Sequence, residues 1–172
     1  MMTRQENLQN KIVTLEEAIR RVGIWRNTGM KITFTNGCFD ILHTGHVTYL
    51  TQAADLANRL IVGLNSDASV KRQGKADNRP INSEASRAIV LAGLSAVDLV
   101  VIFDENTPYE LIKTLQPDIV AKGSDYDADE RNTDSKTYIV GADLMDATGG
   151  KVVSIPLVEG FSTTNLIQKI KQ

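Results

Sequence analysis

The two histidines of this 172-residue chain, His43 and His46, stand three positions apart with Gly45 between them. A spacing of three at the start of a helix places both imidazole rings on one side of the helix end. The glycine removes a side chain from the same place, and the unpaired N–H groups of a helix N-terminus attract phosphate. Two ring N–H donors beside such a helix end suit the binding of a triphosphate.

A metal site and a plain structural role are the alternatives for these histidines. The metal interpretation lacks a suitable third Cys or His ligand nearby. A histidine near a helix start can also be an ordinary core or capping residue. A glycine at position 45 allows a phosphate to approach the helix end closely. We therefore favour phosphate binding and expect no metal ion held by protein ligands.

The elements around the histidines predict an α/β fold. Apolar runs predict strands at 31–35, 60–64, 98–103, 119–121 and 152–155, and they alternate with helices at about 47–56, 83–95, 108–115 and 137–147. A further helix, at about 14–27, begins with Thr14 and Glu17 in the spacing of a capping box. We expect a tail and helix over 1–30, and over 31–172 one Rossmann-like domain with a doubly wound, parallel, five-stranded sheet. Ligands bind such sheets above the carboxyl ends of the strands, where the strand order reverses.

Composition excludes several classes of protein. The 19 Lys and Arg residues against 21 Asp and Glu give a net charge of −2, which provides no general attraction for nucleic acid. Apolar runs such as 88–94 are far shorter than the ~20 residues that span a bilayer. The start of the chain lacks the pattern of a secretory signal, and the single cysteine forms no internal disulfide. We therefore expect a cytoplasmic protein that binds neither membranes nor nucleic acid.

Two short motifs around the histidines resemble the signature of a known family. Residues 37–40 read G-C-F-D and residues 43–46 read H-T-G-H, similar to the G-[ST/C]-F-D…H-x-G-H signature of the nucleotidyltransferases. The resemblance covers about 31–169 and implies that His43 and His46 hold the triphosphate and stabilise charge while the α-phosphorus is attacked. It also implies a substrate contact at Asn36 and nucleotide contacts at Gly37, Cys38, Phe39, Asp40 and Gly45. The sequence identifies no base that would activate the Cys38 thiol, so we expect it to be inert.

The end of the chain carries a second match. Residues 159–164 read E-G-F-S-T-T, which resembles the closing E-G-[IY]-S-[ST]-[ST] motif of the same family. Taken alone, Ser162 is an ordinary helix N-cap. Together with the first motif it predicts a second helix end that binds phosphate. The nucleotide contacts implied here are Phe161, Ser162, Thr163 and Thr164.

A charged segment between the two motifs supplies further candidates. Residues 71–82 are rich in charge, Gly and Pro without apolar periodicity, which predicts an exposed loop. Its basic residues Lys71, Arg72 and Lys75 are suited to clamping phosphates, and we favour Lys71 as a catalytic residue. A solvated basic loop is the alternative. Asp67, at the end of the second strand, is a candidate substrate contact.

Two arginines follow in a stretch that resembles the sugar-phosphate members of the family. There, the corresponding segment leads into the helix beside the nucleotide, which implies a substrate contact for Arg79 and a nucleotide contact for Arg87. An ion pair between Arg87 and Glu84 is the alternative.

The fourth strand ends in the sequence K-G-S-D-Y at 122–126. Gly123 allows a base or sugar to approach closely, and the Asp125 carboxylate can accept hydrogen bonds from hydroxyls. The segment resembles the K-G-G-D-Y of heptose 1-phosphate adenylyltransferases, with Ser124 in place of a glycine. Asp125 and Tyr126 are therefore candidate substrate contacts.

The resemblance implies transfer of AMP from ATP to D-glycero-β-D-manno-heptose 1-phosphate, giving ADP-heptose and pyrophosphate. It also implies Mg²⁺ on the triphosphate, a separate sugar kinase that supplies the phosphate, and a homodimer or higher homo-oligomer. Ile24 and Trp25 are candidates for the interface, and packing within their own domain is the alternative.

Two rival functions remain open. One is a cytidylyltransferase acting on glycerol 3-phosphate or a similar polyol phosphate. Its relatives end in R-T-E-G-I-S-T, whereas Leu157 and Val158 occupy the arginine and threonine positions here. The other is a non-catalytic module that senses nucleotides. The intact His43 and His46 argue against a sensor, which needs no donors specific to a transition state.

Overall fold

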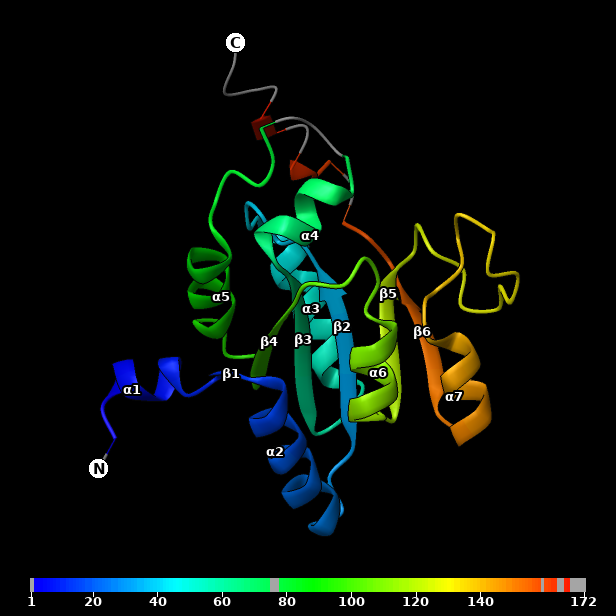
Figure 1. The fold of residues 1–172 in the computed structure, drawn as a ribbon, viewed down its shortest axis with the longest axis horizontal. Helices are drawn as coiled ribbons and strands as arrows, with labels where there is room; N and C mark the ends of the chain where they lie inside the picture. Colours follow the sequence, from blue (N-terminus) through cyan, green and yellow to red (C-terminus); the bar gives the residue numbers. More distant parts are fainter. Residues whose placement is uncertain (1, 75–77, 159, 164–165, 168–172) are drawn as a thin grey trace.

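The computed structural model describes residues 2–74, 78–158, 160–163 and 166–167. Within them, a parallel sheet has the strand order β1-β4-β3-β2-β5-β6 (Figure 1). The predicted Rossmann-like parallel sheet is confirmed, but it has six strands rather than five. The strands are β1 Ile12–Val13, β2 Ile32–Gly37, β3 Arg59–Asn65, β4 Leu99–Phe103, β5 Ile119–Gly123 and β6 Lys151–Ile155.

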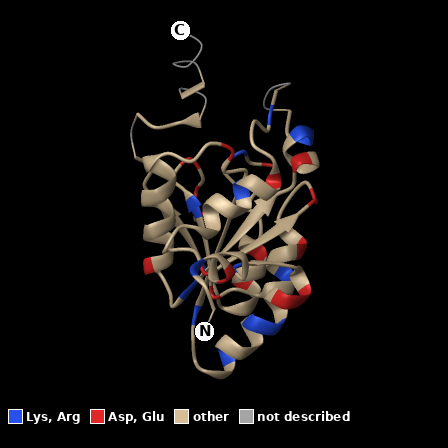
Figure 2. Cartoon of the chain, turned by 90° about the vertical axis from the view of Figure 1, so that its left-hand side faces the viewer, with Lys and Arg blue, Asp and Glu red and all other residues tan. Residues whose placement is uncertain are grey.

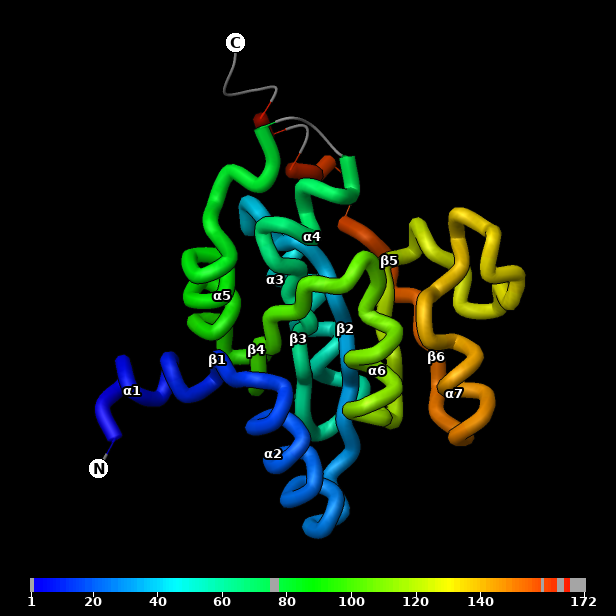
Figure 3. Tube along the Cα trace, viewed as in Figure 1, coloured from blue at the N-terminus to red at the C-terminus, as the bar shows by residue number. Residues whose placement is uncertain are grey.

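The additional strand lies close to the N-terminus. The short helix α1 (Arg4–Gln9) begins with a capping box, in which the side chains of Thr3 and Glu6 each accept a hydrogen bond from the other's backbone N–H. The chain then runs past α5 (Glu84–Ala92) to pair β1 with β4 at the sheet edge (Figure 3). Sequence periodicity could not predict β1 because two residues are too few to show alternation.

Helices cover both faces of the sheet. Helices α2 (Leu15–Asn27), α6 (Tyr109–Leu115) and α7 (Ala142–Thr148) pack on one face, and α3 (Thr44–Asp55) and α5 pack on the other (Figure 1). Successive side chains of a strand point to opposite faces, so Ile61 of β3 joins the first apolar cluster, whereas Leu60 and Val62 join the second. Burial on both faces explains the continuous apolar runs of the strands.

Helix α2 begins as predicted. The Thr14 side chain accepts a hydrogen bond from the Glu17 N–H. The carboxylate of Glu17, however, pairs with Arg20 and Arg21, so only one half of the predicted capping box is formed. Trp25 packs against the apolar core of its own domain and beneath the guanidinium of Arg59.

Two predicted boundaries were wrong. Helix α7 begins at Ala142 rather than near 137, because Gly141 precedes it with a left-handed φ of 92°. The segment that follows β3 contains a short helix, α4 (Asp67–Arg72), capped by the Ser66 hydroxyl. The predicted loop at 71–82 therefore begins inside a helix, and Lys71 lies on its last turn.

Charged residues of both signs are interspersed over the molecule (Figure 2). No helix in the described ranges is both long and apolar enough to cross a bilayer.

Candidate active site

A cavity of about 790 Å³ opens at the carboxyl ends of the central strands. It lies between β2 and β5, where the strand order reverses, which is the position that ligands take in such sheets. The ends of both strands, the first turns of α3 and the segment after β6 form its walls. Predicted site residues among its lining are Asn36, Gly37, Cys38, Phe39, His43, Gly45, His46, Arg79, Gly123, Asp125, Tyr126, Phe161, Ser162 and Thr163.

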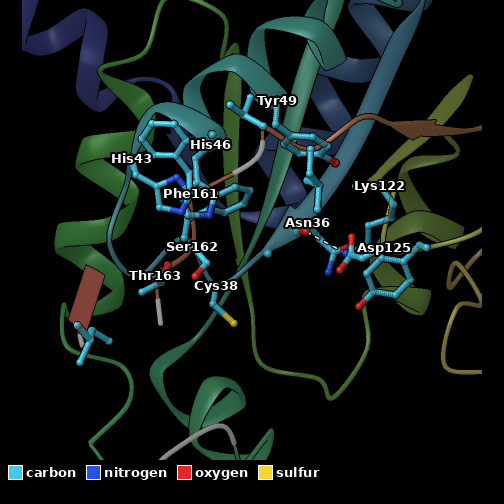
Figure 4. A pocket seen from close by; sticks show the side chains of 18 of the residues that line it. Asn36, Cys38, His43, His46, Tyr49, Lys122, Asp125, Phe161, Ser162 and Thr163 are labelled. Carbon is cyan, nitrogen blue, oxygen red and sulfur yellow. Dashed lines mark hydrogen bonds between the residues drawn. The ribbon is translucent and has the colours of Figure 1, made fainter. Parts of the chain in front are cut away.

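The two histidines lie side by side at the start of α3. His43 is the N-cap residue, and its side chain makes no capping hydrogen bond. Its ring stacks on that of His46 with 3.8 Å between the centroids and 22° between the planes. Phe39 meets the His46 ring edge-on at 5.4 Å, and the Phe161 ring lies 6.1 Å from that of His43. Figure 4 shows His43, His46 and Phe161 together on one side of the cavity.

Partial burial favours the neutral form of both imidazoles. Desolvation lowers the pKa of His43, and desolvation together with the neighbouring His43 lowers the pKa of His46 to about 4. The Ile41 carbonyl opposes this shift at His46, although neither Nδ1 atom has a hydrogen bond of good geometry. Each neutral ring carries one N–H donor. The pair can therefore donate hydrogen bonds to phosphate oxygens without being charged beforehand.

Close contacts disfavour a side chain at the two glycines of the first motif. A Cβ on Gly45 would lie 3.1 Å from two atoms of the His43 ring and 3.2 Å from the Cβ of Phe161. A Cβ on Gly37 would lie 2.9 Å from the ring of Phe39. Phe39 itself has a φ of 44°, in the left-handed region that few non-glycine residues adopt. The turn thus brings an aromatic ring against His46 at the cost of backbone strain.

Asp40 binds the end of the predicted loop rather than facing the cavity. Its buried carboxylate accepts hydrogen bonds from the N–H groups of Ile81 and Asn82. The Nε atom of Arg79 lies 2.5 Å from the same carboxylate. Asn82 returns a hydrogen bond to the Asp40 carbonyl. Asp40 therefore fixes the segment that places Arg79 at the cavity wall, and it is absent from the described lining.

Arg87 has a similar internal role. Its side chain is fully buried and donates to the carbonyls of Cys38 and Asn82 and to the Asp67 carboxylate. The alternative of an ion pair with Glu84 was wrong, because the Glu84 carboxylate accepts from the Asp67 N–H instead. Arg87 and Asp67 do not line the cavity. They join α4, α5 and the first motif into one rigid unit.

The opposite wall comes from the end of β5. The Lys122 ammonium donates to the Asn36 carbonyl at 3.0 Å and lies 5.2 Å from the centre of the Tyr126 ring. Asp125 is exposed to the cavity, and a Cβ on Gly123 would lie 2.7 Å from its Oδ1 atom. Figure 4 shows Lys122 and Asp125 across the cavity from the histidines. The site therefore has a histidine wall and, across from it, a β5 wall that carries Lys122 and Asp125.

Comparison with known proteins identifies the family. The family model described as cytidylyltransferase-like matches residues 34–169. The chain belongs to the cytidylyltransferase-like family. This confirms the resemblance to nucleotidyltransferases, and it places the histidine wall within a family of enzymes that transfer nucleotides.

Several relatives are similar over most of this cytidylyltransferase-like chain. The bifunctional protein HldE of Paramagnetospirillum magneticum is 54% identical over 160 residues, and that of Caulobacter vibrioides is 52% identical over 160 residues. Each alignment covers 93% of this chain and 31% of the relative, so the chain spans about a third of the length of these proteins. A crystal structure of the lipopolysaccharide core biosynthesis protein from Thermoplasma volcanium is similar with a TM-score of 0.57 and 28% identity, covering 76% of this chain and 98% of that one.

Some site residues of this family member were not assigned from its sequence. Tyr49 and Lys122 line the cavity and were given no role. Tyr49 follows His46 by three residues, which places both on one face of a helix and could have indicated its position. Leu157 and Val158, at the arginine and threonine positions of cytidylyltransferases, also line the cavity.

Other predicted residues lie elsewhere. Lys71 and Arg72 are exposed on α4 and do not line the cavity. The Arg72 guanidinium instead contacts the Asn106 side chain and the Asp104 carbonyl. The remaining predicted residues of these motifs, Lys75, Glu159 and Thr164, lie outside the described residues.

The donor set does not fit a cation held by protein ligands. In the described part of the chain, no three His, Cys, Asp or Glu side chains come together in a way that could hold a metal ion. Any Mg²⁺ at this site would depend on oxygen atoms of the substrate.

Proposed function

We propose that this protein is an adenylyltransferase that transfers AMP from ATP to D-glycero-β-D-manno-heptose 1-phosphate, giving ADP-heptose and pyrophosphate. The observation that carries the proposal is the stacked pair of imidazoles at the start of α3, inside the cavity at the sheet's switch point. Uncharged N–H donors can hydrogen-bond to a highly charged triphosphate, and these hydrogen bonds strengthen as negative charge builds up on it.

In the proposed reaction, the anomeric phosphate of the sugar attacks the α-phosphorus of ATP. A bond forms between a sugar-phosphate oxygen and this phosphorus, while the bond from it to the oxygen of the leaving pyrophosphate breaks. The attacking phosphate is already ionised near neutral pH, so no general base is needed. Catalysis then consists of alignment and of neutralising the charge that spreads over the phosphates.

We assign the nucleotide to the histidine wall and the sugar phosphate to the β5 wall. His43 and His46 would donate to the triphosphate, with the 161–163 segment closing over it. Among the described lining residues, the two basic side chains are Arg79 and Lys122. Arg79 lies against Asp40. Lys122 holds its ammonium beside the Asn36 carbonyl at the end of β2, where it would offset phosphate charge. Asp125, exposed beside it, would accept hydrogen bonds from sugar hydroxyls.

Features outside the histidine wall support the choice of substrates. The K-G-S-D-Y segment resembles that of heptose 1-phosphate adenylyltransferases, and the similar Thermoplasma volcanium protein carries the description of a lipopolysaccharide core biosynthesis protein. Leu157 and Val158 provide no equivalent of the arginine side chain that cytidylyltransferases place here. We therefore favour ATP over CTP.

The proposal also names what the reaction requires. Mg²⁺ would accompany the triphosphate as its counter-ion, since the described residues do not form a cage for it. The sugar 1-phosphate must come from a phosphorylating enzyme, and a sugar kinase fits this step. The relatives named bifunctional carry additional chain beyond the part that this protein matches. Self-association is proposed through the exposed apolar side chains of α2, Ile19 and Ile24.

Identification of the product tests this function. The full chain is incubated with ATP, Mg²⁺ and the heptose 1-phosphate, and the products are analysed by ³¹P NMR and mass spectrometry. We expect equimolar ADP-heptose and pyrophosphate, and initial rates of formation of both that are lower by about a hundredfold or more with His46→Ala at matched protein concentration. Pyrophosphate without a sugar nucleotide, or no product with any sugar phosphate, would reject the proposal.

A further inference from the structure

Strands β2 and β5 separate before they end. Their register covers two pairs only, Thr33 with Ile119 and Phe34 with Val120. On its other side each strand stays paired to its last residue, β2 with β3 through Gly37 and β5 with β6 through Gly123. Each half of the sheet is therefore intact while a split opens between them. The cavity occupies this split, because the ends of both strands line it.

The Tyr49 hydroxyl bridges the split where the backbone ladder stops. It donates to the Ala121 carbonyl of β5 at 3.0 Å and lies 2.6 Å from the Thr35 hydroxyl of β2. A phenol has one hydroxyl proton. Because Tyr49 donates this proton to the Ala121 carbonyl, Thr35 must donate to the Tyr49 oxygen. A continuous chain of hydrogen bonds thus runs from β2 through Tyr49 to β5. It replaces the next rung of the ladder.

This tyrosine also belongs to the helix that carries the histidines. Tyr49 lies one turn after His46 on α3, and its buried ring forms part of the cavity lining. Burial and the nearby Asp125 charge raise the pKa of its phenol above the ordinary range, although the Thr35 hydrogen bond opposes this shift. Tyr49 therefore stays a neutral donor and connects three parts: the histidine helix, β2 and β5.

We propose that Tyr49 is a positioning residue that sets the distance between the two walls of the site. Its hydroxyl holds the histidine-bearing helix against the end of β5, from which Lys122 and Asp125 reach the cavity. It is not a catalytic residue, because it acts through the elements that it joins. The proposal rests on the proposed function in so far as two substrates, one on each wall, must be aligned for transfer.

Tyr49→Phe isolates the hydroxyl, since it keeps the ring. Tyr109→Phe is the matched control, because the Tyr109 hydroxyl makes one hydrogen bond, to Asp143, and lies outside the described cavity lining. At saturating ATP and heptose 1-phosphate we expect Tyr49→Phe to lower kcat at least tenfold with the Kd for ATP changed less than threefold. Tyr109→Phe should match wild type in both. A kcat within twofold of wild type for Tyr49→Phe would overturn the proposal. So would a loss of ATP affinity as large as the loss of kcat.

A double-mutant cycle separates positioning from loss of stability. Thr35→Val should lower kcat alone but have no further effect in the Tyr49→Phe background, because the same hydrogen-bond chain is already broken. All rates are measured well below the melting temperature and corrected for the folded fraction. Additive losses would contradict a single chain through Tyr49.

Amide hydrogen exchange tests the role of Tyr49 without relying on enzyme activity. If wild type transferred AMP to no sugar phosphate, the proposed function would be rejected, but the role of Tyr49 could still be tested in this way. The amides of residues 44–50 of α3 and of 119–123 of β5 should exchange at least fivefold faster in Tyr49→Phe than in wild type. Tyr109→Phe should exchange at the wild-type rate in both segments. Unchanged exchange in either segment would overturn the role of Tyr49.

Discussion

The rings of His43 and His46 stack with 3.8 Å between their centroids at the start of α3, and a Cβ on Gly45 between them would lie 3.1 Å from the His43 ring. This arrangement places two neutral N–H donors beside the positive end of a helix. Removing one donor tests its contribution. His46→Ala should fold nearly normally but lower kcat by about a hundredfold or more, as loss of one transition-state donor commonly does. Steady-state pyrophosphate release measures the effect, and unchanged turnover would remove His46 from the reaction.

Acid should destabilise the fold through protonation of His46. The pKa of His46 is about 4 in the folded chain against 6.5 for an ordinary histidine. Between these values the unfolded state binds more protons, so the free energy of unfolding falls as the pH drops from about 6.5 to about 4. His46→Gln should lose this part of the pH dependence. Urea unfolding between pH 4 and pH 8 measures it, and parallel curves for both proteins would contradict the low pKa.

A methyl group at Gly45 should disturb the pair of rings. The added Cβ of Gly45→Ala would press on the His43 ring and on Phe161, so we expect kcat to fall at least tenfold. Gly23→Ala is the control, because a Cβ there meets nothing within 4 Å and alanine favours a helix by up to about 1 kcal/mol. It should leave activity intact and raise stability slightly. Equal activities of the two variants would show that the His43 ring tolerates displacement.

Arg87 should matter for stability more than for nucleotide affinity. Arg87→Lys keeps the charge but cannot reach Cys38, Asn82 and Asp67 together, so the free energy of unfolding should drop by about 2 kcal/mol or more. The Kd of the folded protein for ATP should change much less. Urea unfolding and calorimetric ATP titration give the two values. Unaltered stability with a tenfold weaker Kd would restore Arg87 as a nucleotide contact.

The site's location could be predicted from the sequence, because glycines and histidines between a strand and a helix point to the carboxyl edge of the sheet. The inward-facing roles of Asp40 and Arg87 could not. A basic residue on a helix contacts either a ligand or its own fold, depending on what packs above it. Arg87 does stand on the same stripe of α5 as the buried Leu91, four residues later, which was a usable signal.

The split between β2 and β5 also could not be predicted from the sequence. Each strand shows the same apolar run whether its neighbour stays paired or diverges. Tyr49 reads as a core residue of α3, beside Leu50 and Ala53, and nothing in its sequence context indicates that its hydroxyl spans two strands. Such a role appears only when the register of both strands is known.

Substrate choice tests the central claim most directly. In one pyrophosphate-release assay, kcat/KM is measured for ATP with heptose 1-phosphate and for CTP with glycerol 3-phosphate. We expect the first pair to be favoured at least tenfold, about 1.4 kcal/mol in transition-state binding. Leu157 stands where cytidylyltransferases carry an arginine, and under the proposed function Asp125 would accept hydrogen bonds from sugar hydroxyls. Asp125→Ala should narrow the preference between acceptors and leave the Kd for ATP unchanged. A preference for CTP with glycerol 3-phosphate would contradict the adenylyltransferase assignment.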